Sequence, residues 1–269
     1  MTNSANSDKV VVLDRPAPHV ARLLINRPDK RNAIDHAVRQ ELTAAITALK
    51  DAPDVRALVF GGAQGVFSAG GDIPSMRGLD EAGARARMQH IAVLCRLVAG
   101  LRFPVVSAVE GIGAGAAVGL ALLGDHIVVG PGTRILFPFL KLGLVPDWGQ
   151  LLTLPRRVGV AHARRILTAG EPVMGEEAQR IGLADALVAD AQVMAAAVEK
   201  ATELAKLPID AFARMKDRLN RVSSSLDFEL QREEDDQAVC LVSDEFREGY
   251  DAFANKRAAD FVNLPGASK

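Results

Sequence analysis

Short apolar segments alternate with helical patterns along the first two-thirds of the chain, and this alternation limits the possible folds more than any other feature. Residues 55–60 (VRALVF) and 103–109 (FPVVSAV) read as buried strands, and each leads through a glycine-rich loop into a helical pattern. Strands separated by helices are typical of sheets whose strands run parallel. The sequence therefore predicts an α/β fold with strands that are at least partly parallel.

The two ends of the chain differ from this middle part. Residues 10–14 and 19–26 are β-like runs that predict an N-terminal hairpin or meander. From residue 190 to 257 the periodicity is helical, with no β-like run. We expect a disordered tail over 1–9, an α/β core over 10–190, and a helical region over 191–269 that covers the core or packs on another subunit.

Composition excludes several classes of function. Lys plus Arg is 32 and Asp plus Glu is 33, so no basic excess favours binding to nucleic acid. The two cysteines, Cys95 and Cys240, form neither a CxxC motif nor a Cys/His cluster, which predicts no zinc or other metal site and fits a reducing, cytoplasmic location. The N-terminus is not a secretory signal, and no apolar run is long enough to predict a membrane span.

Two glycine-rich loops, 61–72 and 111–117, lie at strand-to-helix turns. The second contains Gly111-x-Gly113-x-x-Ala116, a relaxed dinucleotide fingerprint, but the next strand lacks the acidic residue that binds the ribose, so we predict no nicotinamide cofactor. Two such loops at neighbouring strand ends can instead direct two backbone N–H groups at one oxygen, as in an oxyanion hole. The alternative is that both are simply tight turns.

An ordered set of segments carries a family resemblance that is far more specific than any one motif. The segments are Asn26-Arg27-Pro28 with Asn32-Ala33, Phe67-Ser68-Ala69-Gly70-Gly71-Asp72-Ile73, Pro104-Val105 through Glu110-Gly111, the helix ending at Asp125, Gly143-Leu144-Val145-Pro146, Ala169-Gly170-Glu171-Pro172, Glu177-Ala178 and Gly182-Leu183. Over about residues 10–262 the chain resembles the enoyl-CoA hydratase/isomerase (crotonase) superfamily.

The resemblance implies a fold, a substrate class and an assembly. The fold is a spiral of ββα units with a C-terminal helical region that builds homotrimers, often paired into hexamers. The substrate is an acyl-CoA, with coenzyme A as part of the thioester and no prosthetic group. The chemistry passes through a thioester enolate held by two backbone N–H groups, which the motif assigns to Gly71 and Ala116. The family usually has glycine at the second position, and alanine keeps the N–H.

The resemblance also implies which residues contact coenzyme A. Residues in the loop at the nucleotide end are Arg27, Lys30 and Ala33. Residues along the adenine and pantetheine path are Ala69, Gly71, Asp72 and Ile73. A basic C-terminal motif, Lys256-Arg257, often reaches phosphate in this family, sometimes across a subunit boundary. The alternative for this pair is a solvated helix end that interacts favourably with the helix dipole.

The chain departs from the family at the two glutamates with which its hydratases activate water. Counting along the motifs places Gly119 and Phe139 at these positions, and neither can transfer a proton. One acid follows the Gly143–Pro146 segment directly: Asp147, where several isomerases of the superfamily also have an acid. A single carboxylate can remove a proton from one carbon and return it to another.

The role of Asp147 stays open in the sequence. Its apolar neighbours Phe139, Leu144 and Trp148 favour a raised pKa and a site without water. Asp147-x-x-Gln150 also matches a helix capping box. The leading hypothesis is an isomerase-type enzyme in which Asp147 moves the proton. The alternatives are another superfamily reaction, such as hydration, with an unidentified acid, and a non-catalytic acyl-CoA-binding subunit.

Overall fold

An antiparallel hairpin opens the fold. The computed structural model describes residues 9–221 and 225–264, so most of the predicted N-terminal tail (1–9) lies outside the described residues. Strands β1 (Val11–Ala17) and β2 (Val20–Ile25) pair antiparallel, with Val11 opposite Ile25. The predicted hairpin is confirmed.

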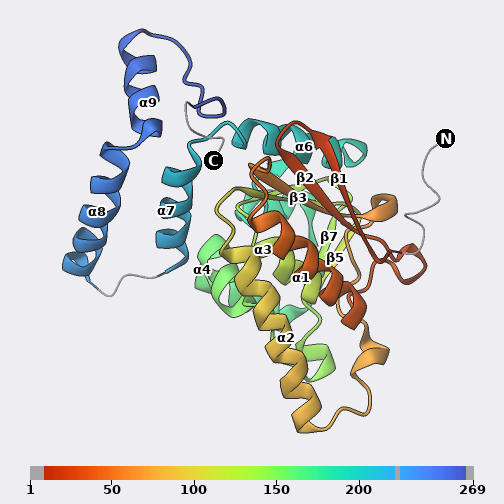
Figure 1. Ribbon diagram of the computed structural model, residues 1–269. Coiled ribbons are helices and arrows are strands. Elements are labelled where there is room, and N and C mark those ends of the chain that lie inside the picture. Colours follow the sequence, from red (N-terminus) through yellow and green to blue (C-terminus); the bar gives the residue numbers. More distant parts are fainter. Residues whose placement is uncertain (1–8, 222–224, 265–269) are drawn as a thin grey trace, which may run out of the picture.

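The main sheet has six strands in the order β1-β2-β3-β4-β6-β9 (Figure 1). From β2 onward all neighbours are parallel. The added strands are β3 (Ala57–Gly62), β4 (Val105–Val109), β6 (His126–Val129) and β9 (Ala186–Leu187). Each parallel neighbour requires a crossover connection, and helices in these connections cover the sheet. The predicted α/β fold with mostly parallel strands is therefore correct.

A second sheet contains three short strands that the hydrophobic pattern predicts only in part. Strand β5 (Ile112–Ala114) pairs parallel with β7 (Arg134–Leu136), which pairs antiparallel with β8 (Val173–Met174). The sequence analysis treats β5 as part of a glycine loop and identifies no strand at β8. Both are too short to show a period of two, and only their tertiary partners make them strands.

Helices cover both faces of the main sheet. Helices α1 (His36–Lys50), α2 (Glu81–Ala99) and α3 (Ala116–Leu122) belong to one core cluster with Leu58 and Phe60 of β3. Helix α6 (Val193–Leu204) packs on the other face, where small residues such as Ala197 and Ala201 meet Ala57 and Val59. The first helix of the 191–269 region thus covers the core. Asp35 caps α1, accepting from the Val38 N–H at 3.0 Å.

The remaining helices are α4 (Gln150–Ala169), α5 (Gly175–Arg180), α7 (Ile209–Asn220), α8 (Leu226–Leu241) and α9 (Asp244–Ala254). Short 3₁₀ turns are η1 (Pro28–Lys30), η2 (Ala63–Gly65), η3 (Ile73–Met76), η4 (Leu140–Leu142) and η5 (Asp190–Gln192). Figure 1 shows α8 and α9 standing away from the α/β body, with α7 between α8 and the body.

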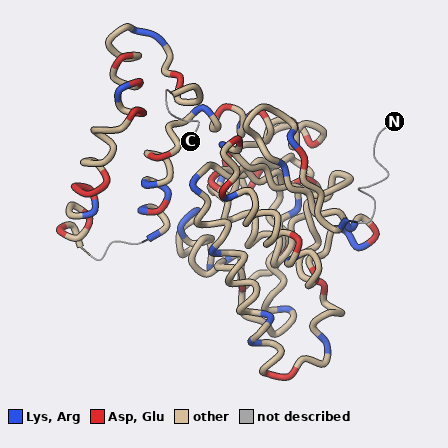
Figure 2. Tube along the Cα trace, viewed as in Figure 1, with Lys and Arg blue, Asp and Glu red and all other residues tan. Residues whose placement is uncertain are grey.

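Charged side chains join α7 to its neighbours on both sides. Acidic and basic residues are mixed along α7 and α8 (Figure 2), and Arg214 pairs with Asp236 at 2.7 Å between the two helices. On the other side, the buried Lys216 Nζ lies 2.7 Å from Asp125 Oδ2 at the end of α3. Asp125 also accepts from the Val105 N–H at 2.8 Å. Asp125 is therefore structural, as predicted. Among the helices described, none is long and apolar enough to cross a membrane.

Candidate active site

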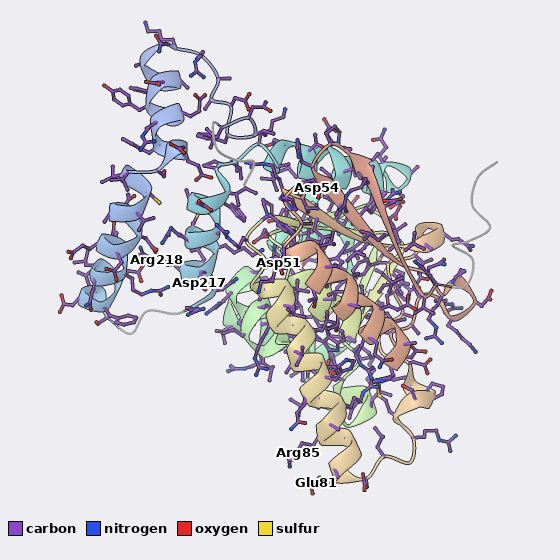
Figure 3. All side chains as sticks on the ribbon, in the orientation of Figure 1. Asp51, Asp54, Glu81, Arg85, Asp217 and Arg218 are labelled. Carbon is purple, nitrogen blue, oxygen red and sulfur yellow. The ribbon has the colours of Figure 1, made fainter. Side chains whose placement is uncertain are left out.

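A cavity of about 810 Å³ lies between the two glycine loops, the first turns of α2 and the segment 138–147. Figure 3 marks this end of α2 by Glu81 and Arg85, at the tip of the helix that projects from the body. The apolar side chains that line the cavity include Ile73, Met76, Leu79, Met88, Phe139 and Leu144. A cavity of this size with a few polar groups is typical of a site for a small organic molecule.

The first glycine loop directs the N–H of Gly71 away from the segment around Ile34, with which the loop pairs. The Ile34 N–H donates to the Gly70 carbonyl at 2.7 Å, and the Asp72 N–H donates to the Ile34 carbonyl at 3.1 Å. Because successive N–H groups of an extended segment point to opposite sides, the Gly71 N–H faces the other way. Gly71 lines the cavity.

The second loop lies directly against the first. A Cβ on Gly70 would lie 2.4 Å from the Ala114 carbonyl oxygen and 3.7 Å from the Ala116 nitrogen, so only glycine permits this approach. Ala116 is the first residue of α3, where a backbone N–H has no acceptor within its own helix. Ala116 also lines the cavity. The structure therefore brings together the two loops that the sequence paired.

Asp147 lines the same cavity and does not cap a helix. Helix α4 begins after Gly149, and no side chain accepts from its first turn. Trp148 and Gly149 both have left-handed backbones, with φ of 54° and 77°, so the chain reverses before the helix starts. Within the described chain, the buried Oδ1 of Asp147 has no hydrogen-bond partner. The capping-box interpretation of Asp147 is wrong, because this turn moves its side chain out of reach of the helix N–H groups.

Burial raises the pKa of Asp147 from 3.8 to about 6, against the opposing charge of Arg87. A carboxyl group loses hydration when it is placed among apolar side chains, and its charged form is then disfavoured. On α2, burial raises the pKa of the Cys95 thiol to about 12, and the charge of Asp147 adds to this effect. The thiol is therefore neutral at physiological pH, whereas the carboxyl group can both accept and release a proton near neutrality.

Gln150 fixes Asp147 relative to the second loop. Its fully buried side chain donates from Nε2 to the Gly115 carbonyl at 3.1 Å and to the Asp147 carbonyl at 3.0 Å. One amide group thus holds both the backbone of Asp147 and the residue before Ala116. From the sequence, Gln150 is interpreted only as part of a capping box, because its partner Gly115 lies in a distant loop.

The two positions at which the resemblance implies glutamate in the hydratases hold no acid, and position 119 leaves no space for one. A Cβ on Gly119 would lie 2.3 Å from the Trp148 Cβ, so the Trp148 side chain occupies this place. Phe139 is 6% exposed and forms part of the cavity wall. Of the apolar neighbours predicted for Asp147, Phe139 and Leu144 line the cavity, whereas Trp148 belongs to the core.

The residues predicted to contact coenzyme A lie mostly together beside the cavity. Ala69, Gly71 and Ile73 line it. Arg27 makes ion pairs with Asp35 at 3.1 Å and with Asp72 at 3.3 Å, and donates to the Ala33 carbonyl at 2.8 Å. Its charge is therefore used within the protein. Lys30 is exposed on η1, where it is free to reach a phosphate.

The C-terminal basic pair is not part of this cluster within one chain. Lys256 and Arg257 follow α9, at the opposite end of the molecule from the tip of α2 (Figure 1). Arg257 donates to Glu248 and to the Ala258 carbonyl. Neither residue lines the cavity of its own chain. A contact with the site of a neighbouring subunit stays a prediction.

Sequence reasoning missed Arg87. Its side chain lines the cavity, and the charges of Asp147 and Asp72 both act on it. The signal was present: Arg87 interrupts the inward-facing stripe of α2 formed by Ala84, Ile91 and Leu94. A charged residue at an apolar helical position indicates a special environment. In the described part of the chain, no three His, Cys, Asp or Glu residues gather as a metal-binding group.

Comparison with known proteins agrees with the fold and the motifs. The family model described as enoyl-CoA hydratase/isomerase matches residues 17–263. The chain is 30% identical over 257 residues to a protein named 1,2-epoxyphenylacetyl-CoA isomerase from Escherichia coli (strain K12), covering 93% of this chain and 98% of that protein. It is 33% identical to a probable enoyl-CoA hydratase from Rhodobacter capsulatus, covering 90% and 94%.

Solved structures show the same architecture. A putative enoyl-CoA hydratase from Streptomyces coelicolor A3(2) superposes with a TM-score of 0.88 at 32% identity, over 97% of this chain and 98% of that one. The chain therefore belongs to the enoyl-CoA hydratase/isomerase family, and the predicted crotonase-like fold is confirmed.

Proposed function

We propose that this protein moves a proton between two carbons of an acyl-CoA thioester, with Asp147 as the acid and base. The observation that carries the proposal is the position of Asp147 in the cavity: its Oδ1 is buried without a partner, and burial raises its pKa to about 6. An acid of this kind is suited to take a proton and give it back. Coenzyme A enters as part of the substrate, and no prosthetic group takes part.

The proposed reaction has two proton transfers and no net change in composition. Asp147 removes a proton from a carbon next to, or conjugated with, the thioester. The electron pair of the broken C–H bond moves onto the thioester oxygen, which the N–H groups of Gly71 and Ala116 stabilise as an enolate oxygen. Asp147 then returns its proton to another carbon, and the double bond shifts.

The absence of an acid at positions 119 and 139 favours isomerisation over hydration. Addition of water requires groups that hold and activate it, and Trp148 and Phe139 occupy these places with apolar atoms. An apolar wall also excludes water from the enolate. The name of the relative from Escherichia coli, 1,2-epoxyphenylacetyl-CoA isomerase, is consistent with isomerase chemistry, whereas the name of the Rhodobacter relative favours hydration.

The nucleotide part of coenzyme A is proposed to lie along the first loop. Ala69, Gly71, Asp72 and Ile73 then contact the pantetheine and adenine groups, and the Arg27–Ala33 loop contacts the nucleotide end. Lys30 is the exposed cation of this loop. Lys256 and Arg257 are proposed to reach phosphate from a neighbouring subunit, because neither lines the cavity of its own chain.

The test is incubation in D₂O with a panel of enoyl-CoA and dienoyl-CoA esters, read by mass spectrometry. We expect deuterium uptake without a water adduct, and a loss of turnover of about 10²- to 10⁴-fold in Asp147→Asn with acyl-CoA binding retained. Asp51→Asn, an exposed acid after α1, is the matched control. A water adduct identifies a hydratase. Full turnover in Asp147→Asn excludes Asp147 as the base.

We also propose that the chain assembles into a homotrimer, or a hexamer of two trimers, through α8 and α9. These helices expose large apolar side chains, among them Phe253 at 85% and Tyr250 at 62%. Several large exposed apolar side chains on two projecting helices are typical of a subunit interface.

A further inference from the structure

Arg87 stands on the cavity wall without a counter-ion. Within the described residues, Arg87 and Asp147 are the two ionisable side chains that line this cavity. The guanidinium group lies near the first loop: its Nη2 would be 3.6 Å from a Cβ on Gly71. In residues 9–221 and 225–264, no hydrogen bond or ion pair is formed by Arg87. Burial lowers its pKa, because the charged form is only partly hydrated.

The carboxylates that could neutralise Arg87 are either occupied or too far away for an ion pair. Asp72 is held by Arg27 at 3.3 Å, and Arg27 is also paired with Asp35. Asp147 influences Arg87 through its charge, but its Oδ1 has no hydrogen-bond partner in the described chain. Among the described residues, Arg87 therefore has no direct ion pair, and Asp147 and Asp72 act on it only through their charges.

A second arginine behind Arg87 adds to this charge. Arg39 is 3% exposed, and its Nε and Nη1 find no partner among the described residues. Its Nη2 lies 3.4 Å from His36 Nδ1, and the His36 ring lies 5.1 Å from that of His90. Burial lowers the pKa of Arg39 to about 10, and the like charge of Arg87 acts in the same direction. A buried cation whose N–H groups are only partly hydrogen-bonded costs stability, so an anion that approaches this wall is bound favourably.

We propose that the acyl group of the substrate carries a carboxylate and that Arg87 binds it. The proposal rests on the proposed function, since it takes the cavity as an acyl-CoA site. The position of Arg87 next to Gly71 and Asp147 places the anion on the acyl part of the substrate rather than on the phosphates of coenzyme A. A guanidinium group matches a carboxylate with two parallel hydrogen bonds. Arg39 contributes positive charge near Arg87 and makes no contact with the substrate.

The test measures binding, so it needs no turnover. Isothermal titration calorimetry compares two sets of CoA thioesters with saturated acyl groups of three to six carbons. In the first set, the dicarboxylyl esters, the acyl group ends in a free carboxylate. In the second set, the monocarboxylic esters, it has the same length and no carboxylate. At one chain length or more, we expect the dicarboxylyl ester to bind about 10- to 100-fold more tightly, the range of a charge-assisted hydrogen-bonded pair. Arg87→Met should abolish this preference, and Arg87→Lys should keep part of it.

Arg85→Met is the matched control. Arg85 lies two residues away on α2, at the tip shown in Figure 3, and pairs with Glu81 on the exposed side at 2.7 Å. Its loss should leave the preference unchanged. Equal affinities for both ester types at every length overturn the proposal, as does a preference that survives in Arg87→Met. If Arg87→Met instead lowers only the rate of deuterium exchange, Arg87 acts on Asp147 and binds no carboxylate. If the preference holds but no ester exchanges deuterium, the carboxylate site stands and the proton transfer fails.

Discussion

At the scale of single residues, the site combines groups that would each be unfavourable elsewhere. Asp147 is a carboxyl group among apolar side chains, and Trp148 next to it has a left-handed backbone that a bulky residue seldom adopts. Gly119 makes this arrangement possible, because any side chain there would collide with Trp148. Gly119 stands where the hydratases have a glutamate. The same glycine leaves the space that Trp148 needs, and this turn places Asp147 in the cavity.

Asp147→Asn should stabilise the fold at high pH. The folded protein holds the proton of Asp147 up to about pH 6, and the unfolded chain releases it near pH 3.8. The charge of Asp147 therefore lowers stability above pH 6, and this effect fades as the pH falls from 6 to 4. With a discount for partial exposure, we expect a gain of about 1–2 kcal/mol at pH 8.

Urea unfolding of both proteins at pH 8 and at pH 3.5 measures this difference. The gain should be present at the higher pH and absent at the lower one, where both side chains are neutral. For Asp51→Asn, the difference in stability from the parent protein should not depend on pH in this way. An equal stability of Asp147→Asn and the parent protein at pH 8 would mean that the carboxylate is well hydrated.

At the scale of elements, α7 connects the α/β body to the projecting helices. Lys216 of α7 is 4% exposed and donates to Asp125 and, at 3.3 Å, to the Phe103 carbonyl. Both partners belong to segments that flank β4, so one side chain joins a C-terminal helix to the centre of the main sheet. Because it is apolar over most of its length, the lysine side chain can cross the core and place its charge at the far end.

Lys216→Met should destabilise the protein by about 2–4 kcal/mol, since it leaves Asp125 partly buried without its cation. Asp125 keeps the Val105 N–H as a donor, which limits the loss. Lys200→Met, which removes an exposed pair with Glu203, should stay within about 0.5 kcal/mol. Chemical denaturation of the two variants gives the comparison. Similar stabilities would show that the Lys216 pair does not anchor α7.

At the scale of the whole molecule, the α8–α9 region exposes a group of large apolar side chains away from the α/β body. Leu226, Val242, Tyr250 and Phe253 of the α8–α9 region are each more than 60% exposed. Helices α8 and α9 make few contacts with the α/β body and stand clear of it (Figure 1). The assembly proposed above would cover these side chains.

Phe253→Asp should disrupt the assembly, because a charge at a buried apolar contact is costly. Size-exclusion chromatography with light scattering should give three or six times the chain mass of 28.6 kDa for the parent protein and smaller species for the variant. Leu13→Asp, an exposed change on β1, should keep the parent mass. A parent protein that elutes as a monomer would reject the proposed interface.

Much of this protein is determined by sequence patterns of short range. Short apolar runs predict β1 to β4, and helical patterns predict the helices that follow the two glycine loops, because burial produces a recognisable local pattern of apolar residues. The cap of α1 at Asp35 depends only on residues within one turn. The two glycine loops are visible for the same reason, because glycines permit close approach wherever the backbone requires it.

Tertiary structure decided what no local pattern contains. Whether Asp147 caps α4 or faces the cavity depends on the turn at Trp148, and that turn depends on Gly119, which lies in another helix. The pKa of Asp147 and the missing counter-ion of Arg87 come from burial by segments far apart in the chain. Burial and charge compensation are sums over neighbours in space, so the sequence supplied the reactive groups and the fold alone set their environment.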